Sequence, residues 1–400
     1  MDQRNAPEPP DLAALAERLT AELRAQGVAG NTAYDQANQR LINESIDPIS
    51  VAGLVLTLSR APEAEHDEVV RRYVAAHLRG KPTIETWAEA REKVLPRIRP
   101  EIEQACWGLR SGLEGWALPS MPTGPVTEHL RVQFVWEVED AFATVHADDV
   151  ERWGVTLDEL QDAASANLGH RTPSPAQWMG NESAPGVFRS SWADGFDATR
   201  VLFAGGLGLP AEGPLVAIAP NDSTLLLADS SNESAVFHLG LTVQRLVQET
   251  KQMVWLWPLL LDGDVRRHWL PEESSAAFAP MSVCAAIHAQ LAYQEHGALL
   301  QRALDAENAG IRVGLVGMAQ SPLGSAVTVA VWEEGTPVAL GHADLVQFRR
   351  GETVLGMAPW AKVEEVLGDA LEAIPGYPAR YRVTDFPEDW QLTQMELFGG

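Results

Sequence analysis

Apolar residues recur every three or four positions in several stretches of this chain, and this spacing predicts amphipathic helices. The first stretch begins at Asp11, places Leu15, Leu19 and Leu23 on one face, and ends before Gly27. Further helices are expected at residues 65–78, 83–92, 148–153, 156–168, 233–251, 282–305 and 361–373.

Strands are predicted where apolar and β-branched residues run together or alternate with polar ones. The clearest alternation lies at residues 130–138, whereas 253–261 is the most apolar stretch of the chain. Other strands are expected at residues 51–58, 94–98, 214–219, 223–228, 311–318, 326–333, 337–348 and 379–385. Several connections between these strands are too short for parallel crossovers. The chain is therefore predicted to be an α+β protein, with two or three units of mainly antiparallel sheet on which helices pack.

The length of 400 residues favours two or three domains of about 150 residues each. Residues 1–10 are polar and contain prolines, so they are expected to form a disordered tail. Residues 111–126 are rich in proline and glycine, which is typical of a linker or a long loop. The sequence thus predicts an N-terminal α+β unit at 11–110, a central α+β domain at 127–275 and a C-terminal α+β unit at 276–400.

A series of short motifs runs from about residue 31 to residue 262. The motifs are a Pro-Arg strand at 94–99, an apolar strand at 130–138, a strand-acid-helix step at 144–153, a helix at 157–168 ending on Asn-Leu, and a strand-turn-strand at 216–227 around Pro-x-Asp. This order resembles the YtpQ-like proteins, a bacterial family of unknown function. The chain has Asn221 where the family pattern has a basic residue. The resemblance implies a fold for a little over half the chain, and no activity.

The chain is strongly acidic, with 55 aspartates and glutamates against 30 lysines and arginines, and a net charge of −25. Such a charge repels phosphate backbones and anionic membranes, which disfavours nucleic acid and membrane surfaces as partners. The excess of arginine over lysine is typical of a GC-rich bacterial genome. The first residues lack the features of a signal peptide. No apolar run approaches the roughly 18 residues of a membrane-spanning helix, so a cytoplasmic location is expected.

Motif spacing predicts neither a metal nor a cofactor. The two cysteines, Cys106 and Cys284, stand far apart and are expected to be small buried apolar residues. His288 and His296 lie on one predicted helix, but eight positions correspond to about 12 Å, which is too far to share an ion. The G-x-G-x-x-A match at residues 206–211 lacks the following helix that a dinucleotide site requires.

The turn of Pro220, Asn221 and Asp222 is expected to join two antiparallel strands. Aspartate in turns commonly accepts hydrogen bonds from nearby backbone N–H groups, and Asp222 is predicted to do so. If the turn serves a ligand instead, Arg97 or Arg99 is the expected partner of Asn221 and Asp222. These four residues are the candidate ligand-binding set of an unrecognised enzyme, and no catalytic residue is assigned.

Thirteen tryptophans exceed average usage, and most are expected in the core. Trp178, Trp332 and Trp360 are the candidates for contact with a partner, because exposed aromatic residues favour interfaces. Residues 311–348 are predicted to form a meander. Within it, the strand at 326–333 is apolar on both faces, which predicts burial on both sides.

Two hypotheses of function follow. The first is a non-catalytic protein-interaction or adaptor protein that binds an unidentified protein through the C-terminal unit, unless that unit packs on the central domain. The second is the enzyme with a site near the Pro-Asn-Asp turn. The sequence does not determine the oligomeric state.

Overall fold

The computed structural model describes residues 12–35, 40–43, 45–51, 54, 58, 62–78, 83–115, 120–138, 141–172, 178–181, 184–192, 194–206, 208–249, 254–263, 265–321 and 323–399. The tail expected at residues 1–10 lies outside these ranges. The chain divides into two compact units, Met1–Glu85 with Glu137–Ala143, and Thr86–Trp136 with Thr144–Gly400. Each unit combines helices with sheets that are mainly antiparallel, so the α+β prediction is confirmed.

The first unit contains helices and a three-stranded antiparallel sheet of order β1-β2-β3. Its elements are α1 (Leu12–Ala25), β1 (Thr32–Asp35), β2 (Arg40–Asn43), β3 (Ile46–Ser50), η1 (Glu63–Glu65) and α3 (His66–Leu78). Leu15, Leu19 and Leu23 of α1 are buried in one core with Val70 and Val74 of α3. Both predicted helices and their apolar faces are therefore confirmed.

The strand predicted at residues 51–58 is wrong. Val51, Leu54 and Leu58, the residues of this stretch that the structure describes, are helical and buried. Their spacing of three and four residues is that of one helix face. This periodicity outweighs the strand preference of the β-branched residues around them.

The second unit begins with an antiparallel sheet of order β4-β6-β5. Its elements are α4 (Trp87–Ala90), β4 (Val94–Pro100), α5 (Glu101–Glu114), β5 (Thr123–Thr127), β6 (Leu130–Val138), α6 (Ala147–Trp153) and α7 (Leu157–His170). Strand β7 (Ala141–Thr144) follows β6 in the chain, and all of it except Thr144 is assigned to the first unit. The strand predicted at 130–138 is confirmed at the same residues. Helix α5 is not among the predicted elements, and it extends into the expected linker, where Gly115 ends it in a left-handed conformation.

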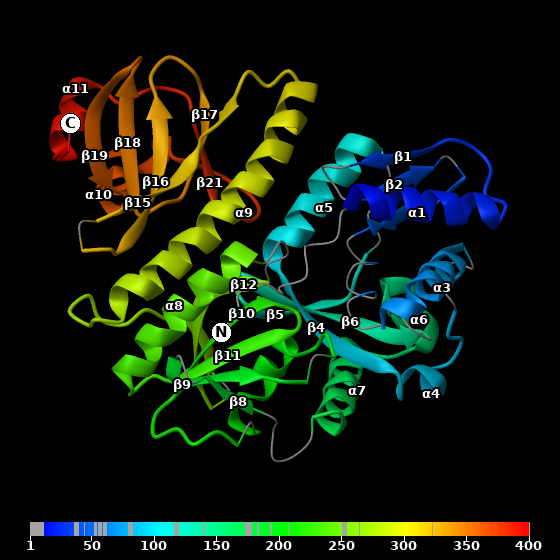
Figure 1. The fold of residues 1–400 in the computed structure, drawn as a ribbon. Helices are drawn as coiled ribbons and strands as arrows, with labels where there is room; N and C mark the ends of the chain where they lie inside the picture. The colour runs from blue at the N-terminus through cyan, green and yellow to red at the C-terminus, as the bar shows by residue number, and fades with distance from the viewer. Residues whose placement is uncertain are drawn as a thin grey trace. The chain divides into compact units, whose positions relative to one another are not determined.

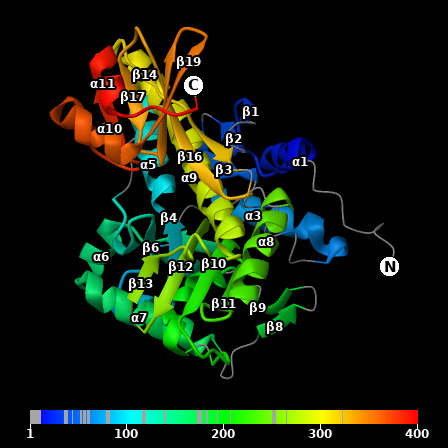
Figure 2. The ribbon, with the colours of Figure 1, turned by 90° about the vertical axis from the view of Figure 1, so that its left-hand side faces the viewer.

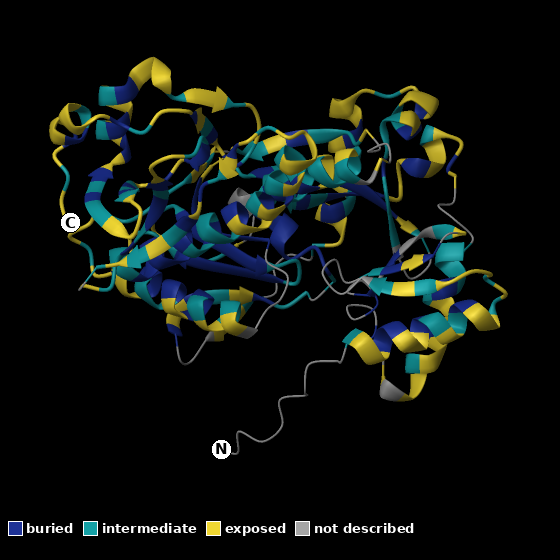
Figure 3. Ribbon diagram, turned by 90° about the horizontal axis from the view of Figure 1, so that it is seen from above, coloured by how far each residue is buried: buried dark blue, intermediate teal, exposed yellow. Residues whose placement is uncertain are grey.

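A six-stranded antiparallel sheet of order β13-β12-β10-β11-β9-β8 forms the centre of the second unit (Figure 1). Its strands are β8 (Trp178–Asn181), β9 (Ala184–Ser190), β10 (Leu215–Asn221), β11 (Thr224–Asp229), β12 (Trp255–Asp262) and β13 (Val265–His268). One face packs on Ile98, on Leu130 and on η2 (Ala198–Gly206). The other packs on α8 (Glu233–Glu249) and the start of α9 (Phe278–Ala306). Successive residues of β10 and β11 are buried, as the dark blue strands of Figure 3 illustrate. Cover on both faces of the sheet explains these continuous apolar runs.

Two four-stranded sheets with mixed strand directions complete the second unit. Their orders are β14-β17-β21-β20 and β15-β16-β18-β19. The elements are β14 (Arg312–Val313), β15 (Val316–Gln320), β16 (Ala326–Glu333), β17 (Val338–Gly341), β18 (Leu345–Arg350), β19 (Thr353–Pro359), α10 (Trp360–Leu367), η3 (Gly368–Ala370), β20 (Glu372–Ile374), β21 (Arg380–Val383) and α11 (Asp389–Gln394). Trp332, Leu340 and Val363 belong to the core that both sheets share with α10.

The meander predicted for residues 311–348 is wrong, because β16 and β18 are parallel neighbours whereas β17 belongs to the other sheet. The segment expected as one strand at 337–348 is interrupted at residues 342–344. There, Asp344 Oδ2 accepts hydrogen bonds from the backbone N–H and the hydroxyl of Thr328, each at 2.7 Å. These bonds hold the chain where it crosses from one sheet to the other.

Helix α9 joins the predicted central and C-terminal units into one body (Figures 1 and 2). Met281 and Cys284 in its first half are buried with α8 and the six-stranded sheet, whereas Tyr293 in its second half belongs to the C-terminal core. Leu299 packs on Cys106 of α5, so the structure differs from the predicted boundaries at 110 and 275. Both cysteines are buried, as expected. Neither α9 nor any other described helix is both long and apolar enough to cross a membrane.

Gly341→Ala should destabilise the second unit by about 1–3 kcal/mol, as overpacking does in protein cores. Gly341 lies in β17, where an added Cβ would lie 2.9 Å from the Tyr293 ring and closer still to Val316. Chemical denaturation followed by circular dichroism measures the change. Gly317→Ala in β15 is the matched control, because a Cβ there meets nothing within 4 Å. Equal losses of stability in the two variants would contradict this packing.

Candidate functional site

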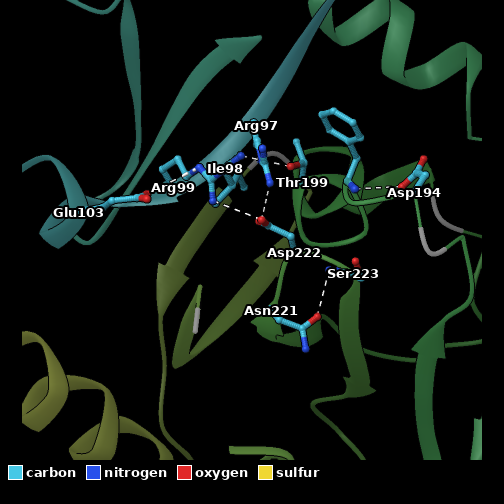
Figure 4. Close-up of polar contacts among 10 residues, drawn as sticks. Arg97, Ile98, Arg99, Glu103, Asp194, Thr199, Asn221, Asp222 and Ser223 are labelled. Atoms are coloured by element: carbon cyan, nitrogen blue, oxygen red, sulfur yellow. Dashed lines mark hydrogen bonds and ion pairs between the residues drawn. The ribbon is translucent and has the colours of Figure 1, made fainter. Parts of the chain in front are cut away.

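Strand β4 brings Arg97 and Arg99 to the turn between β10 and β11, as Figure 4 shows. Residues two apart on a strand point to the same side, so both guanidinium groups face Asp222, while Ile98 between them is buried in the core. Asp222 Oδ2 lies 2.5 Å from Arg97 Nη2 and 3.3 Å from Arg99 Nη1. On the other side, Arg99 Nε lies 3.6 Å from Glu103 Oε2 of α5.

Hydrogen bonds from η2 hold the strand and the turn in place. The Ile98 N–H donates to Thr199 Oγ1 at 3.1 Å, and the Ala198 N–H donates to the Asp222 carbonyl at 3.2 Å. Segment η2 therefore bridges β4 and the turn. The fold brings three of the four predicted ligand-binding residues together, Asp222 and both arginines, across sequence separations of 123 and 125 residues.

The fourth residue, Asn221, faces its own turn. Its Oδ1 accepts a hydrogen bond from the Ser223 N–H at 3.0 Å. The turn between antiparallel strands is confirmed, but the backbone-capping role predicted for Asp222 is wrong, because Asn221 performs it. A neutral amide is sufficient to cap a turn, whereas two largely buried cations require an anion.

The ion cluster is largely buried and electrically balanced. The side chains of Arg97, Arg99 and Asp222 are 19%, 21% and 16% exposed. Burial raises the pKa of the Asp222 carboxyl, but the charges of Arg99 and Arg97 lower it by more, so the pKa lies below its ordinary value. Burial, and then the charge of Arg99, lowers the pKa of Arg97. Together with Glu103, the cluster contains two carboxylates and two guanidinium groups, so its charges balance. Such a balance is typical of a structural ion cluster and not of a site that binds an ion from solution.

An open groove of about 820 Å³ lies in the C-terminal part of the second unit. Its floor is the β15-β16-β18-β19 sheet, where Val329, Val331 and Met357 line it. Tyr293 and Gln294 of α9 line its wall. All of the residues that line the groove are uncharged, so it is suited to apolar and uncharged polar groups.

The groove exists because α9 covers only part of one sheet face. Strand β16 turns Ala330 and Trp332 into the C-terminal core, so that Val329 and Val331 point to the opposite face. Val329 and Val331 line the groove together with Tyr293 and Gln294 of α9. The apolar second face predicted for residues 326–333 is therefore present, and its open part is the floor of the groove.

The groove is bordered by β15, one of the two edge strands of its sheet. Leu315, just before β15, is 74% exposed, and Met318 within it is 39% exposed. Leu323, after the strand, is 89% exposed. Neighbouring exposed apolar side chains beside a strand with an unpaired edge are typical of an interaction surface.

None of the three tryptophans predicted to contact a partner lines the groove. Trp332 and Trp360 are only 2% and 6% exposed and belong to the C-terminal core. Both lie on the inward faces of β16 and α10, so neither is available for contact with a partner. Trp178 is half-buried against Trp192, with ring centroids 5.2 Å apart, and its contact with a partner stays a prediction.

Sequence reasoning does not identify Leu315, Met318 or Gln347 as groove residues. A signal for the first two lies in the glycines beside them, Gly314 and Gly317. Glycine weakens a strand interior and often marks a close approach of another backbone. Gln347 has no such signal in the sequence, because a single glutamine in a predicted strand is expected to face solvent.

Asp222→Asn should lower the free energy of unfolding at neutral pH by about 3 kcal/mol, because two largely buried guanidinium groups then share a single carboxylate, that of Glu103. The folded-state pKa of Asp222 lies below its ordinary value, so the unfolded chain takes up this proton first as the pH falls. The stabilisation is therefore complete above about pH 4 and is lost as the pH falls through the folded-state pKa.

Urea denaturation at neutral pH and at pH values below 4 measures this effect. Asp262→Asn, at the exposed end of β12, is the control and should change stability by less than about 0.5 kcal/mol. If Asp222→Asn is as stable as the wild type at neutral pH, the ion pairs do not hold β4 against the turn.

No protein-family model, no curated protein and no solved structure matches this chain. The resemblance to the YtpQ-like proteins therefore stays a prediction.

Proposed function

We propose that this protein is a non-catalytic adaptor that binds an extended segment of another protein in the groove beside β15. The observation that carries the proposal is the uncharged, largely apolar groove bordered by an edge strand. Strand β15 pairs with β16 on one side only among the described strands. An incoming strand would hydrogen-bond to the other side, and its alternate side chains would enter the groove.

The groove specifies the chemistry of this segment. Its floor of Val329, Val331 and Met357 accepts apolar side chains, and the amides of Gln294 and Gln347 offer hydrogen bonds to a peptide backbone. The chain's net charge of −25 repels acidic segments and attracts basic ones. The partner segment is therefore extended, apolar at alternate positions and flanked by lysine or arginine.

The alternative hypothesis, an enzyme with a site at the Pro-Asn-Asp turn, has less support. Asp222 and the two arginines pair with one another, and Asn221 caps its own turn. None of these four residues lines the groove. The groove itself is lined by no charged residue that would serve as a general acid or base.

Gly317→Phe should weaken binding of such a segment by more than about tenfold, or about 1.4 kcal/mol. Gly317 pairs with Val329, lines the groove and leaves open space around an added Cβ. A phenyl ring there fills the groove without disturbing the core, and phenylalanine favours strands. Peptides selected from a random display library on the full-length protein supply the probe, and fluorescence anisotropy measures their affinity.

Gly180→Phe is the matched control, since Gly180 lies in the edge strand β8 and also meets nothing within 4 Å. Its affinity for the selected peptides should equal that of the wild type, and thermal unfolding verifies that both variants are folded. Equal binding to wild type and Gly317→Phe would refute the groove as the site. Enrichment of acidic peptides would refute the proposed chemistry of the partner.

A further inference from the structure

Three histidines from distant parts of the chain meet in the second unit. His129 precedes β6, His268 ends β13 and His288 lies on α9. The ring centroid of His129 is 4.4 Å from that of His268 and 5.9 Å from that of His288. The rings of Trp257 and Tyr377 each lie 5.1 Å from the His129 ring. The imidazoles are thus gathered beside large aromatic side chains.

Two of these imidazoles have no internal hydrogen-bond partner. In the part of the chain that the structure describes, both ring nitrogens of His129 and both of His268 are buried and make no hydrogen bond. An unsatisfied buried polar group costs about 1–3 kcal/mol, so it requires an explanation. His288 differs, because its Nδ1 accepts a hydrogen bond from the Leu256 N–H at 3.4 Å. A bound ligand would satisfy the nitrogens that the protein leaves without a hydrogen bond.

Imidazole nitrogens are common ligands of transition-metal ions, because the neutral ring carries a free lone pair that the ion can accept.

A carboxylate completes a set of three ligands. Glu128 Oε1 lies 3.3 Å from His129 Nε2, and its side chain is 72% exposed. Three possible ligand atoms lie within 4.8 Å of one another, one each from Glu128, His129 and His268. In a tetrahedral site with bonds of about 2.1 Å, ligand atoms are about 3.4 Å apart, so small side-chain rotations would place them around one ion. The exposed carboxylate places one ligand of the set at the protein surface.

We propose that Glu128, His129 and His268 bind one divalent transition-metal ion of the class to which Zn²⁺ belongs. Two imidazoles and one carboxylate form a known type of three-ligand zinc site, with a position left open. Magnesium and calcium prefer sites made entirely of oxygen ligands. Motif spacing does not reveal the set, because its two histidines lie in distant parts of the chain. The site shares no residue with the groove lining, so it is independent of the proposed function.

Titration of the full-length, chelator-treated protein with Zn²⁺ tests the proposal. Calorimetry should show one ion per chain, and Co²⁺ should give the visible absorption of a four-coordinate site. His129→Gln and His268→Gln should each weaken Zn²⁺ affinity by more than about 100-fold, because losing a ligand exceeds the cost of losing an outer partner. Glu128→Gln changes an exposed side chain, which protects the fold, and should weaken affinity at least about tenfold.

Two histidine variants outside the cluster are the controls. His296→Gln removes another buried imidazole of α9, and His170→Gln removes an exposed one; both should bind Zn²⁺ like the wild type. Absence of stoichiometric Zn²⁺ binding by the wild type would overturn the proposal. Binding by His129→Gln and His268→Gln as tight as that by the control variants would also overturn it, and Glu128→Gln decides the matter if the histidine variants do not fold.

Discussion

The burial of α9 along most of its length is the constraint on which the second unit depends. Its first half contributes Met281 and Cys284 to the core beneath the six-stranded sheet, and its second half contributes Tyr293 to the C-terminal core. Apolar surface buried on two sides of one helix couples two sheet systems that would otherwise be separate domains. The same helix supplies one wall of the groove through Tyr293 and Gln294.

Charge has different roles in the interior and at the surface of this protein. In the interior ion cluster, Arg97 and Arg99 pair with Asp222 and Glu103. These pairings offset the free-energy cost of removing each charge from water. The groove is lined by uncharged residues, although the chain as a whole carries a net charge of −25. An uncharged groove in an acidic protein favours an apolar segment with basic flanks and rejects an acidic one.

Local pattern was enough for many of the elements. Helices α1, α3 and α8 and strands β6 and β16 follow directly from apolar periodicity, because each buries a face whose spacing is visible in the sequence. The Pro-Asn-Asp turn and the α+β class follow from turn residues and short connections. At residues 51–58 the β-branched residues favoured a strand although the described positions are helical, because a short apolar run is compatible with either a helix or a strand.

The sequence by itself determined the α+β class, most of the elements and the residue types available for a site. Tertiary structure alone decided that Asp222 pairs with Arg97 rather than with its own turn, and that His129 meets His268. It also placed β17 in a different sheet from β16. Such pairings join residues far apart in the chain, and they are set by which sheet faces bury against each other, whereas local periodicity reports only that a face is buried.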